Sequence, residues 1–151
     1  MPRHGAPLLR VASVARVTLD GDLPGRTFPP VGPYLVTAER VAEFAAATGG
    51  EYAGGPAPTT FPIVPAFRAM RALMDDPSVG IALHRVVHGE QRFSYSRPVV
   101  PGDELTATLT VDSVRSIGGA DIIATRSEIV DAAGSHVVTA HAVLVHRGEE
   151  Q

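Results

Sequence analysis

The chain has 151 residues, of which 44% are hydrophobic, so it is long enough for a single domain with a substantial core. It contains no cysteine, which excludes disulfides, zinc–thiolate sites, iron–sulfur clusters and thiol nucleophiles and agrees with a cytoplasmic location. The formal net charge of −3 does not favour nucleic-acid binding, and no stretch approaches the roughly 20 apolar residues of a membrane span.

The N-terminal part of the chain shows no strong periodicity. We expect residues 1–24 to form an extension, in which residues 11–17 are a candidate strand, and residues 148–151 to form a tail. Residues 23–30 are interrupted by proline and glycine, which is typical of a connector. The main domain is therefore predicted to span residues 25–147.

Two helices are predicted in the first half of this domain. Thr37 is a favourable N-cap for the first helix, and apolar side chains follow it at helical spacing until Gly49 and Gly50 end the helix. After a loop at residues 50–62, a second helix is predicted to begin near Pro65 and to end before Pro77. The apolar face of this second helix is expected in the core and consists of Ala66, Phe67, Met70, Leu73 and Met74.

From Ile81 onward the periodicity changes to that of β-structure. Turn residues separate the predicted strands at residues 81–96, 104–115, 120–131 and 136–147. Residues 105–112 alternate between apolar and polar side chains, as in a strand with one buried face. The last strand is apolar on both faces, which requires cover from a helix on one side and from a partner subunit on the other. Helices followed by antiparallel strands predict an α+β domain whose sheet wraps around the second helix.

Two segments carry a family resemblance. The first is Tyr34–Gly49 with Ala57–Pro62, and the second is His88–Asp103, which continues to Arg115. In order and spacing they resemble the MaoC-like dehydratase family in its FAS1-like, N-terminal type, and they are similar to the non-catalytic subunits of mycobacterial (3R)-hydroxyacyl-ACP dehydratases. The resemblance covers about residues 25–147 and implies a single hot-dog domain, with the helix at residues 66–75 enclosed by the sheet. It further implies that two such domains pair, with an acyl chain between them and a phosphopantetheine arm reaching in from the surface.

The catalytic pair of the family is missing from its usual place. Catalytic members carry Asp and His in a segment Gly-Asp-x-Asn-Pro-x-His, and these two residues activate a water for addition to a conjugated thioester or run the reverse elimination. Here Gly50 stands where the Asp is expected, and no histidine follows before His84. We therefore expect a MaoC-like partner to supply the pair.

Two residues remain as candidate catalytic bases within this chain. Glu51 follows the first helix, and the alternative is a solvated loop carboxylate. His88 opens the second family-like segment, and the alternative is a hydrogen-bonded histidine at a subunit contact. His84 and His88 are about 13 Å apart if they lie in one strand, too far to share a metal, so we expect no metal site. Gly89 indicates a bulge in this strand.

The candidate substrate-binding residues gather around the loop that precedes the second helix. Backbone N–H groups at a helix start suit an oxyanion or thioester contact, with simple helix capping as the alternative. Arg97 is a candidate ligand for the phosphate of CoA or of a carrier arm, with a structural ion pair to Asp103 as the alternative. The full candidate set is Tyr52, Thr59, Thr60, Phe61, Phe67, Met70, His88 and Arg97.

These observations predict a subunit of a heteromeric (3R)-hydroxyacyl-thioester dehydratase or enoyl-thioester hydratase, of the fatty-acid or polyketide type. Its ligand is expected to be an acyl-CoA or acyl-ACP thioester, without a cofactor, and its partner a MaoC-like catalytic subunit or a second copy of itself. Two alternatives remain, a stand-alone hot-dog thioesterase or hydratase and a non-enzymatic acyl-binding domain. Turnover by the isolated chain favours the former, and binding without turnover favours the latter.

Overall fold

The computed structural model describes residue 19 and residues 21–148, so the candidate strand at residues 11–17 lies outside the described residues. The described chain contains the strands β1 (Val31–Leu35), β2 (Val86–Tyr95), β3 (Glu104–Ile117), β4 (Ala120–Val130) and β5 (His136–Arg147). The helices are α1 (Ala38–Ala47), α2 (Ile63–Met74) and the short 3-10 helix η1 (Leu83–Arg85). Neither α1 nor α2 has the length and hydropathy that a membrane span requires.

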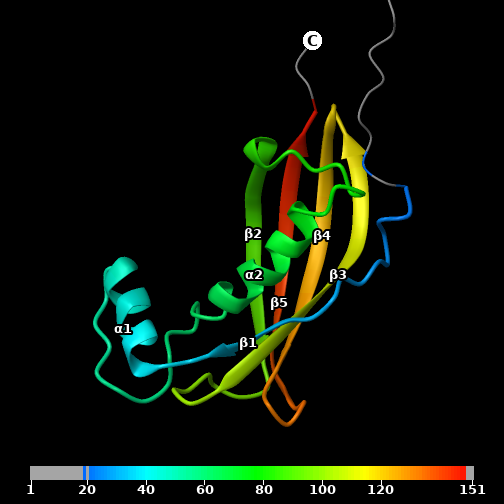
Figure 1. The fold of residues 1–151 in the computed structure, drawn as a ribbon. Coiled ribbons are helices and arrows are strands. Elements are labelled where there is room, and N and C mark those ends of the chain that lie inside the picture. Colours follow the sequence, from blue (N-terminus) through cyan, green and yellow to red (C-terminus); the bar gives the residue numbers. More distant parts are fainter. Residues whose placement is uncertain (1–18, 20, 149–151) are drawn as a thin grey trace, which may run out of the picture.

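One antiparallel sheet, in the order β1-β3-β4-β5-β2, curves around α2 (Figure 1). The inward side chains of β3 alternate as predicted, and Leu105, Ala107, Leu109 and Val111 are fully buried. They belong to one hydrophobic cluster with the buried stripe of α2, which consists of Ala66, Ala69, Met70, Leu73 and Met74. This arrangement confirms the predicted α+β class and is that of a hot-dog fold. Leu23, which we had assigned to the N-terminal extension, also lies in this cluster.

Strand β5 lies inside the sheet, paired with β4 on one side and with β2 on the other. Residues 137–140 are all buried, so side chains on both faces are covered at this end of the strand. Further along, Ala142 and Leu144 on the inner face are buried, whereas Val143 and Val145 on the outer face are half-buried. The apolar residues on both faces of this strand are therefore explained at residues 137–140, where β5 is buried on both sides within the sheet.

Three local features differ from the sequence prediction. Strand β1 was not predicted, because it is short and Gly32-Pro33 interrupts its apolar pattern. Residues 81–85 were predicted as strand but contain η1, and the N–H of Ala82 donates to Nε2 of His146 at 3.1 Å. The ring of His146 is itself buried, so this contact anchors the segment to the sheet.

The third difference concerns Phe67, which was predicted to lie in the core but is 44% exposed. The buried stripe of α2 runs through positions 66, 69, 70 and 73, and the 3.6-residue repeat places position 67 beside that stripe.

Helix α1 begins and ends as predicted and stands beside the sheet rather than on it (Figure 1). Thr37 caps its start by accepting a hydrogen bond from the N–H of Arg40 at 3.1 Å, and Gly49 follows its end with a φ of 84°. The connection from Thr48 to Pro62 then returns the chain to α2. An arm formed by α1 and this connection therefore projects beside β2.

The close approach of β1 to β3 requires glycine at position 32. A Cβ on Gly32 would lie 2.7 Å from the backbone oxygen of Leu105, and its φ of +142° is unfavourable for other residues. We expect Gly32→Ala to destabilise the fold by about 1–3 kcal/mol, measured by thermal or chemical unfolding. Gly54→Ala is the control, because Gly54 has a φ of +99° but no atom within 4 Å of its added Cβ. An equal loss in both variants would refute the steric explanation.

Candidate functional site

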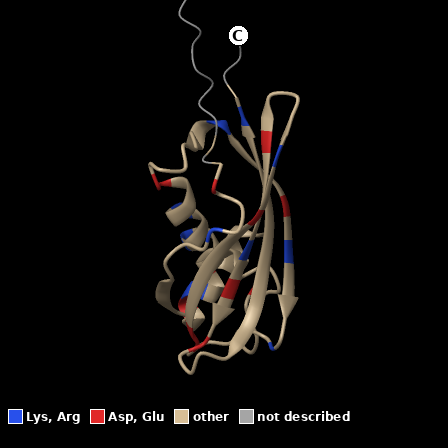
Figure 2. Cartoon of the chain, turned by 90° about the vertical axis from the view of Figure 1, so that its right-hand side faces the viewer, with Lys and Arg blue, Asp and Glu red and all other residues tan. Residues whose placement is uncertain are grey.

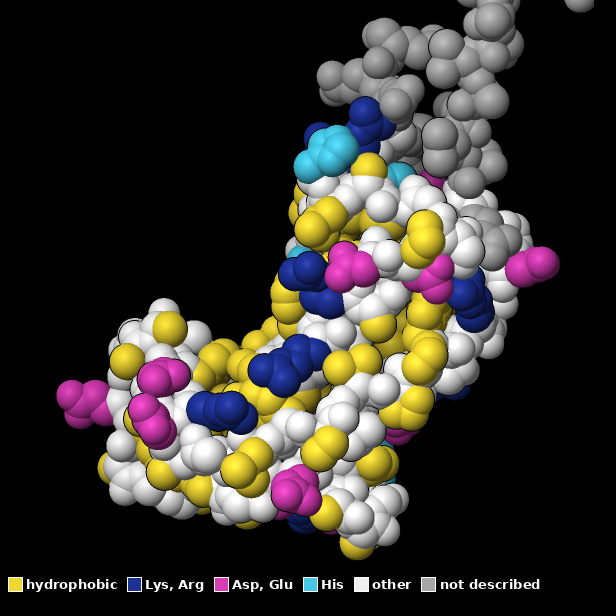
Figure 3. Space-filling view, viewed as in Figure 1, with side chains coloured by type: hydrophobic (Ala, Val, Ile, Leu, Met, Phe, Trp, Pro, Cys, Tyr) yellow, Lys and Arg dark blue, Asp and Glu magenta, His cyan; other side chains and the backbone are white. Residues whose placement is uncertain are grey.

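An open cleft of about 930 Å³ lies between the edge strand β2, the end of α1 and the start of α2. Figure 3 shows hydrophobic side chains lining the hollow between the α1 arm and the rest of the molecule. A volume of this size is typical of small-molecule sites. The lining residues are Phe44, Thr48, Thr59, Thr60, Ile63, residues 88–93 and Tyr95.

The walls of the cleft are largely apolar, although Glu90 and Arg92 of β2 are also among its lining residues. Figure 2 shows acidic and basic residues interspersed along the strands and at the ends of the sheet. In the described part of the chain, no group of three or more His, Asp or Glu side chains has an arrangement that could hold a metal ion. The lining therefore combines apolar side chains with hydroxyl groups from Thr48, Thr59 and Thr60.

Strand β2 forms one wall of the cleft and one edge of the sheet. Among the described strands it pairs only with β5, so its other edge presents unpaired backbone N–H and C=O groups. The register shifts between His88 and Glu90, which confirms the predicted irregularity at Gly89. Val87 on this strand is 51% exposed and adds an apolar side chain to the unpaired edge.

Tyr95 joins β2 to the connection between the two helices. Its hydroxyl donates to the backbone oxygen of Thr59 at 2.5 Å, and both residues also line a smaller pocket of about 340 Å³. Burial raises the pKa of Tyr95 to about 12, so the phenol stays protonated at physiological pH and remains a hydrogen-bond donor. Tyr95 therefore forms a polar partition between the two hollows.

Three of the predicted site residues line the cleft. Thr59 and Thr60 lie at its α2 end, and His88 lies on β2, where its Nε2 shares a 3.0 Å hydrogen bond with Oε1 of Gln91. Glu51 is exposed and lines neither hollow. The segment 49–62 holds no other acid and no histidine, so the described geometry brings no acid–base pair together there.

The other predicted residues occupy the core or the surface beside the cleft. Phe61 is fully buried and contacts Phe44 edge-to-face at 5.4 Å between ring centres, while Met70 is also buried. Tyr52 donates from its hydroxyl to the backbone oxygen of Gly55 at 2.5 Å, which closes the loop on itself. Phe67 is exposed on α2 and leaves an apolar surface uncovered. Of these four, none lines the cleft directly.

Several lining residues escaped the sequence reasoning. Phe44 was assigned only to the apolar stripe of the first helix, and Ile63, between the predicted loop and the predicted second helix, was not assigned a role. Phe93 and Tyr95 share one face of β2 through its two-residue repeat, with ring centres 6.5 Å apart. Two aromatic residues at i and i+2 on an edge strand are a signal that would have indicated this wall.

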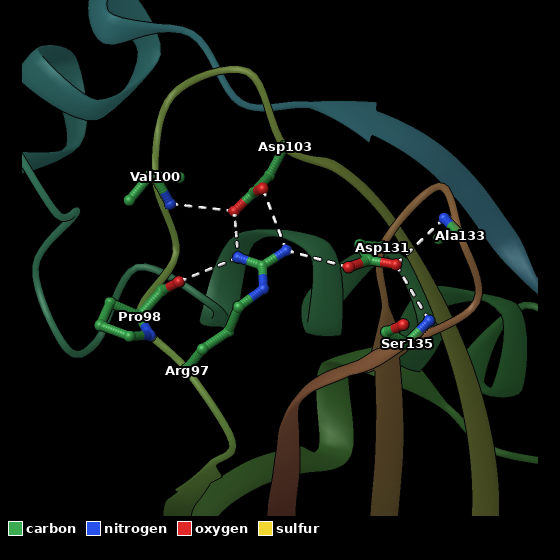
Figure 4. A network of polar contacts seen from close by, with 7 residues as sticks. All are labelled: Arg97, Pro98, Val100, Asp103, Asp131, Ala133 and Ser135. Atoms are coloured by element: carbon green, nitrogen blue, oxygen red, sulfur yellow. Dashed lines mark hydrogen bonds and ion pairs between the residues drawn. The ribbon is translucent and has the colours of Figure 1, made fainter.

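Arg97 is held by carboxylates rather than left free at the surface (Figure 4). Its guanidinium donates to both oxygens of Asp103, at 2.9 and 3.1 Å, and to Asp131 at 3.2 Å. Backbone N–H donation from Ser135, followed by the Arg97 contact, lowers the pKa of Asp131. The network fastens the turn before β3 to the turn before β5, which is the structural ion pair with Asp103 that the sequence offered as the alternative role of Arg97.

Comparisons with known proteins point to one family. A model described as the FAS1-like, dehydratase domain region matches residues 22–140. A UPF0336 protein of Leifsonia xyli is 47% identical over 148 residues, covering 89% of this chain and 99% of that protein. A UPF0336 protein of Streptomyces coelicolor is 42% identical over 149 residues, covering 89% of this chain and 99% of that protein.

Two solved structures share the fold and part of the sequence. The HadBC (3R)-hydroxyacyl-ACP dehydratase complex of Mycobacterium tuberculosis contains a chain that is 28% identical, with a TM-score of 0.69 over 82% of this chain and 97% of that one. A MaoC-like dehydratase is 31% identical, with a TM-score of 0.69 over 83% of this chain and 42% of that one.

The raised pKa of Tyr95 predicts that its phenol ionises at a higher pH than an ordinary tyrosine. We expect absorbance at alkaline pH to show one phenol still protonated at about pH 11, and Tyr95→Phe to remove that phase. Because the folded-state pKa exceeds the unfolded value, this group's contribution to stability is complete below about pH 10 and is lost as the pH rises toward 12. Tyr52→Phe is the control, and a late phase that survives in Tyr95→Phe would assign it to another tyrosine.

The Arg97 network predicts an acid-dependent stability difference. The pKa of Asp131 is lowered in the folded chain, so its stabilising effect is present above the ordinary carboxyl pKa and is lost as the pH falls through the lowered value. We expect Arg97→Gln to reduce the melting temperature most near neutral pH, with the difference from the parent chain narrowing as the pH falls below the ordinary carboxyl pKa of about 3.9. Arg71→Gln, which breaks an exposed pair with Asp75, is the control. A difference that does not change with pH would contradict this account.

Proposed function

The chain belongs to the FAS1-like dehydratase-region family of MaoC-like hot-dog proteins, and we propose that it is the acyl-binding subunit of a (3R)-hydroxyacyl-thioester dehydratase. In this proposal a MaoC-like partner subunit supplies the Asp and His that act on the substrate, and the complex works in the cytoplasm. The substrate is an acyl-CoA or acyl-carrier-protein thioester, of the fatty-acid or polyketide type.

Two features together support the proposal. The cleft is suited to an acyl chain, and the connection between α1 and α2, residues 49–62, contains no acid–base pair. Aromatic and aliphatic side chains, among them Phe44, Ile63 and Phe93, provide apolar walls. Thr59 and Thr60 place hydroxyl and backbone groups where the chain returns to α2. Burial of each methylene of an acyl chain contributes about 0.8 kcal/mol, so such a cleft favours long apolar substrates.

The need for a partner is supported by the edge strand. The unpaired backbone of β2 and the exposed side chain of Val87 on the same strand form an edge that a second subunit would cover. A strand added to β2 would also close the open side of the cleft, because β2 is one of its walls. The related HadBC dehydratase is itself a complex, which agrees with a shared site. The partner would then bring its catalytic pair to the open side.

The proposal is tested by reconstitution. We expect the isolated chain to show no measurable hydration of an enoyl thioester, and co-expression with a MaoC-like partner that carries the intact Asp/His motif to give a stable complex with hydratase activity. Light scattering after size exclusion measures the complex, and loss of enoyl absorbance measures turnover. Full activity of the isolated chain would overturn the proposal, as would failure of every such partner to bind.

A cleft variant separates acyl binding from assembly. Ile63→Asp places a charge beside the acyl chain and should lower kcat/KM of the complex at least tenfold, because burying an unpaired charge in an apolar site is unfavourable. Ile117→Asp is the matched control, since Ile117 is 56% exposed at the β3–β4 turn, away from the cleft lining. If both substitutions lowered kcat/KM equally, the cleft would not be the site that binds the acyl chain.

A further inference from the structure

Two arginines stack on the same buried tyrosine ring. The guanidinium carbons of Arg40 and Arg68 lie 4.8 and 4.7 Å from the ring centre of Tyr34, which is 5% exposed. The two charged groups are therefore at most the sum of these distances apart, about 9.5 Å. Arg40 comes from α1 and Arg68 from α2, so the ring holds together two cations from different elements.

Neither cation is neutralised by a carboxylate within the described residues. Arg40 donates from Nη1 to the backbone oxygen of Leu35 at 2.7 Å, which leaves its other donors available, and Arg68 makes no ion pair with a described residue. Both side chains are exposed. Glu39 and Glu43 share α1 with Arg40, but neither forms an ion pair with it in this part of the chain. By contrast, Arg71, which is also on α2, is paired with Asp75.

Two like charges held close together gain from an anion between them. Stacking on an aromatic face leaves the N–H donors at the perimeter of each guanidinium free to point outward. These planar donors match the oxygens of a phosphate, and two guanidiniums separated by less than 10 Å can share one phosphate or two linked phosphates. The arrangement is therefore better suited to a phosphate than to a single carboxylate.

The arginine pair is connected to the cleft by aromatic packing. Phe44, a wall of the cleft, contacts Phe61 at 5.4 Å between ring centres, and Phe61 lies 6.3 Å from Tyr34. Arg40 and Phe44 are four residues apart and thus share one face of α1. Figure 3 shows arginine side chains between the α1 arm and the central helix, beside the hollowed apolar surface. The arginine pair and the cleft wall are therefore held by one group of packed rings and by one face of α1.

We propose that Arg40 and Arg68, stacked on Tyr34, bind the phosphate of a pantetheine-type carrier arm whose acyl end occupies the cleft. This inference rests on the proposed function for the identity of the arm. The phosphate chemistry is shared by two sources, the diphosphate of a free CoA thioester and the single phosphodiester of a carrier-protein arm.

The test compares ligands with and without phosphate on the full chain by calorimetry. We expect pantetheine 4′-phosphate to bind about tenfold more tightly than pantetheine, a gain equivalent to one charge-assisted hydrogen bond. Arg40→Gln and Arg68→Gln should each abolish most of this preference. Arg71→Gln, the same change of charge on the same helix but away from Tyr34, should retain it. A preference that survives in Arg40→Gln and Arg68→Gln, or that is missing in the parent chain, would overturn the site.

Further ligands identify the source and keep the two proposals separate. If CoA binds more tightly than pantetheine 4′-phosphate and the arginine variants lose this difference, the site is supported and its ligand is the CoA diphosphate. If the two ligands bind equally, the site is supported and its ligand is the carrier arm. A phosphate-free acyl-pantetheine thioester measures the cleft alone. If that thioester binds but phosphate adds nothing, the phosphate site is wrong and the proposed function stands. If it neither binds nor is turned over by any reconstituted complex, the proposed function fails, and the arm loses its support with it.

Discussion

The burial of α2 against the inner face of the sheet is the contact on which the rest of the molecule depends. Its stripe of small and medium side chains, including Ala66, Ala69 and Leu73, allows the helix to lie close to β3 and inside the curve of the sheet. At roughly 25 cal/mol for each Å² of apolar surface, this burial is the main favourable term that orders the domain. It also fixes the start of α2, and with it Thr59, Thr60 and Ile63, beside the edge strand β2.

The cleft follows from two consequences of that packing. Because α2 fills the concave face, the connection from α1 has to pass outside it, and α1 is left as an arm beside β2. Because β2 is the last strand in the order β1-β3-β4-β5-β2, its outer edge stays unpaired among the described strands. A hollow open on one side is the result. An edge of this kind favours pairing with another chain, so the same geometry that makes the hollow also favours a partner that closes it.

Parts of this arrangement were predictable from the sequence. The two-residue alternation at 105–112 and the N-cap at Thr37 are local signals that tertiary packing reinforces, and both predictions were correct. Strand β1 was missed because its pairing with β3 depends on contacts far away in the sequence, and η1 because Ala82 is held by His146, 64 residues later. Phe67 was placed in the core because its hydrophobicity outweighed its angular position in the pattern. The packed rings of Phe44, Phe61 and Tyr34 come from three separate segments, so no pattern within any one segment predicts their contact.

The segment 49–62 contains no acid–base pair, so in the proposed function the packed rings of Phe44, Phe61 and Tyr34 serve substrate binding and not catalysis. On the proposed division of labour, this chain holds the substrate at both ends, with apolar walls for the acyl group and arginines for the phosphate, while the reacting carbons meet groups from the partner. Contacts remote from the reacting atoms act on ground state and transition state alike unless they also position the thioester. Substitutions at the walls or at Tyr34 should then act mainly through KM, and those in the partner's pair through kcat. Tyr95 is the exception in this chain, because it fixes Thr59 at the start of α2, where the thioester would have to lie, and its loss would be expected to change both constants.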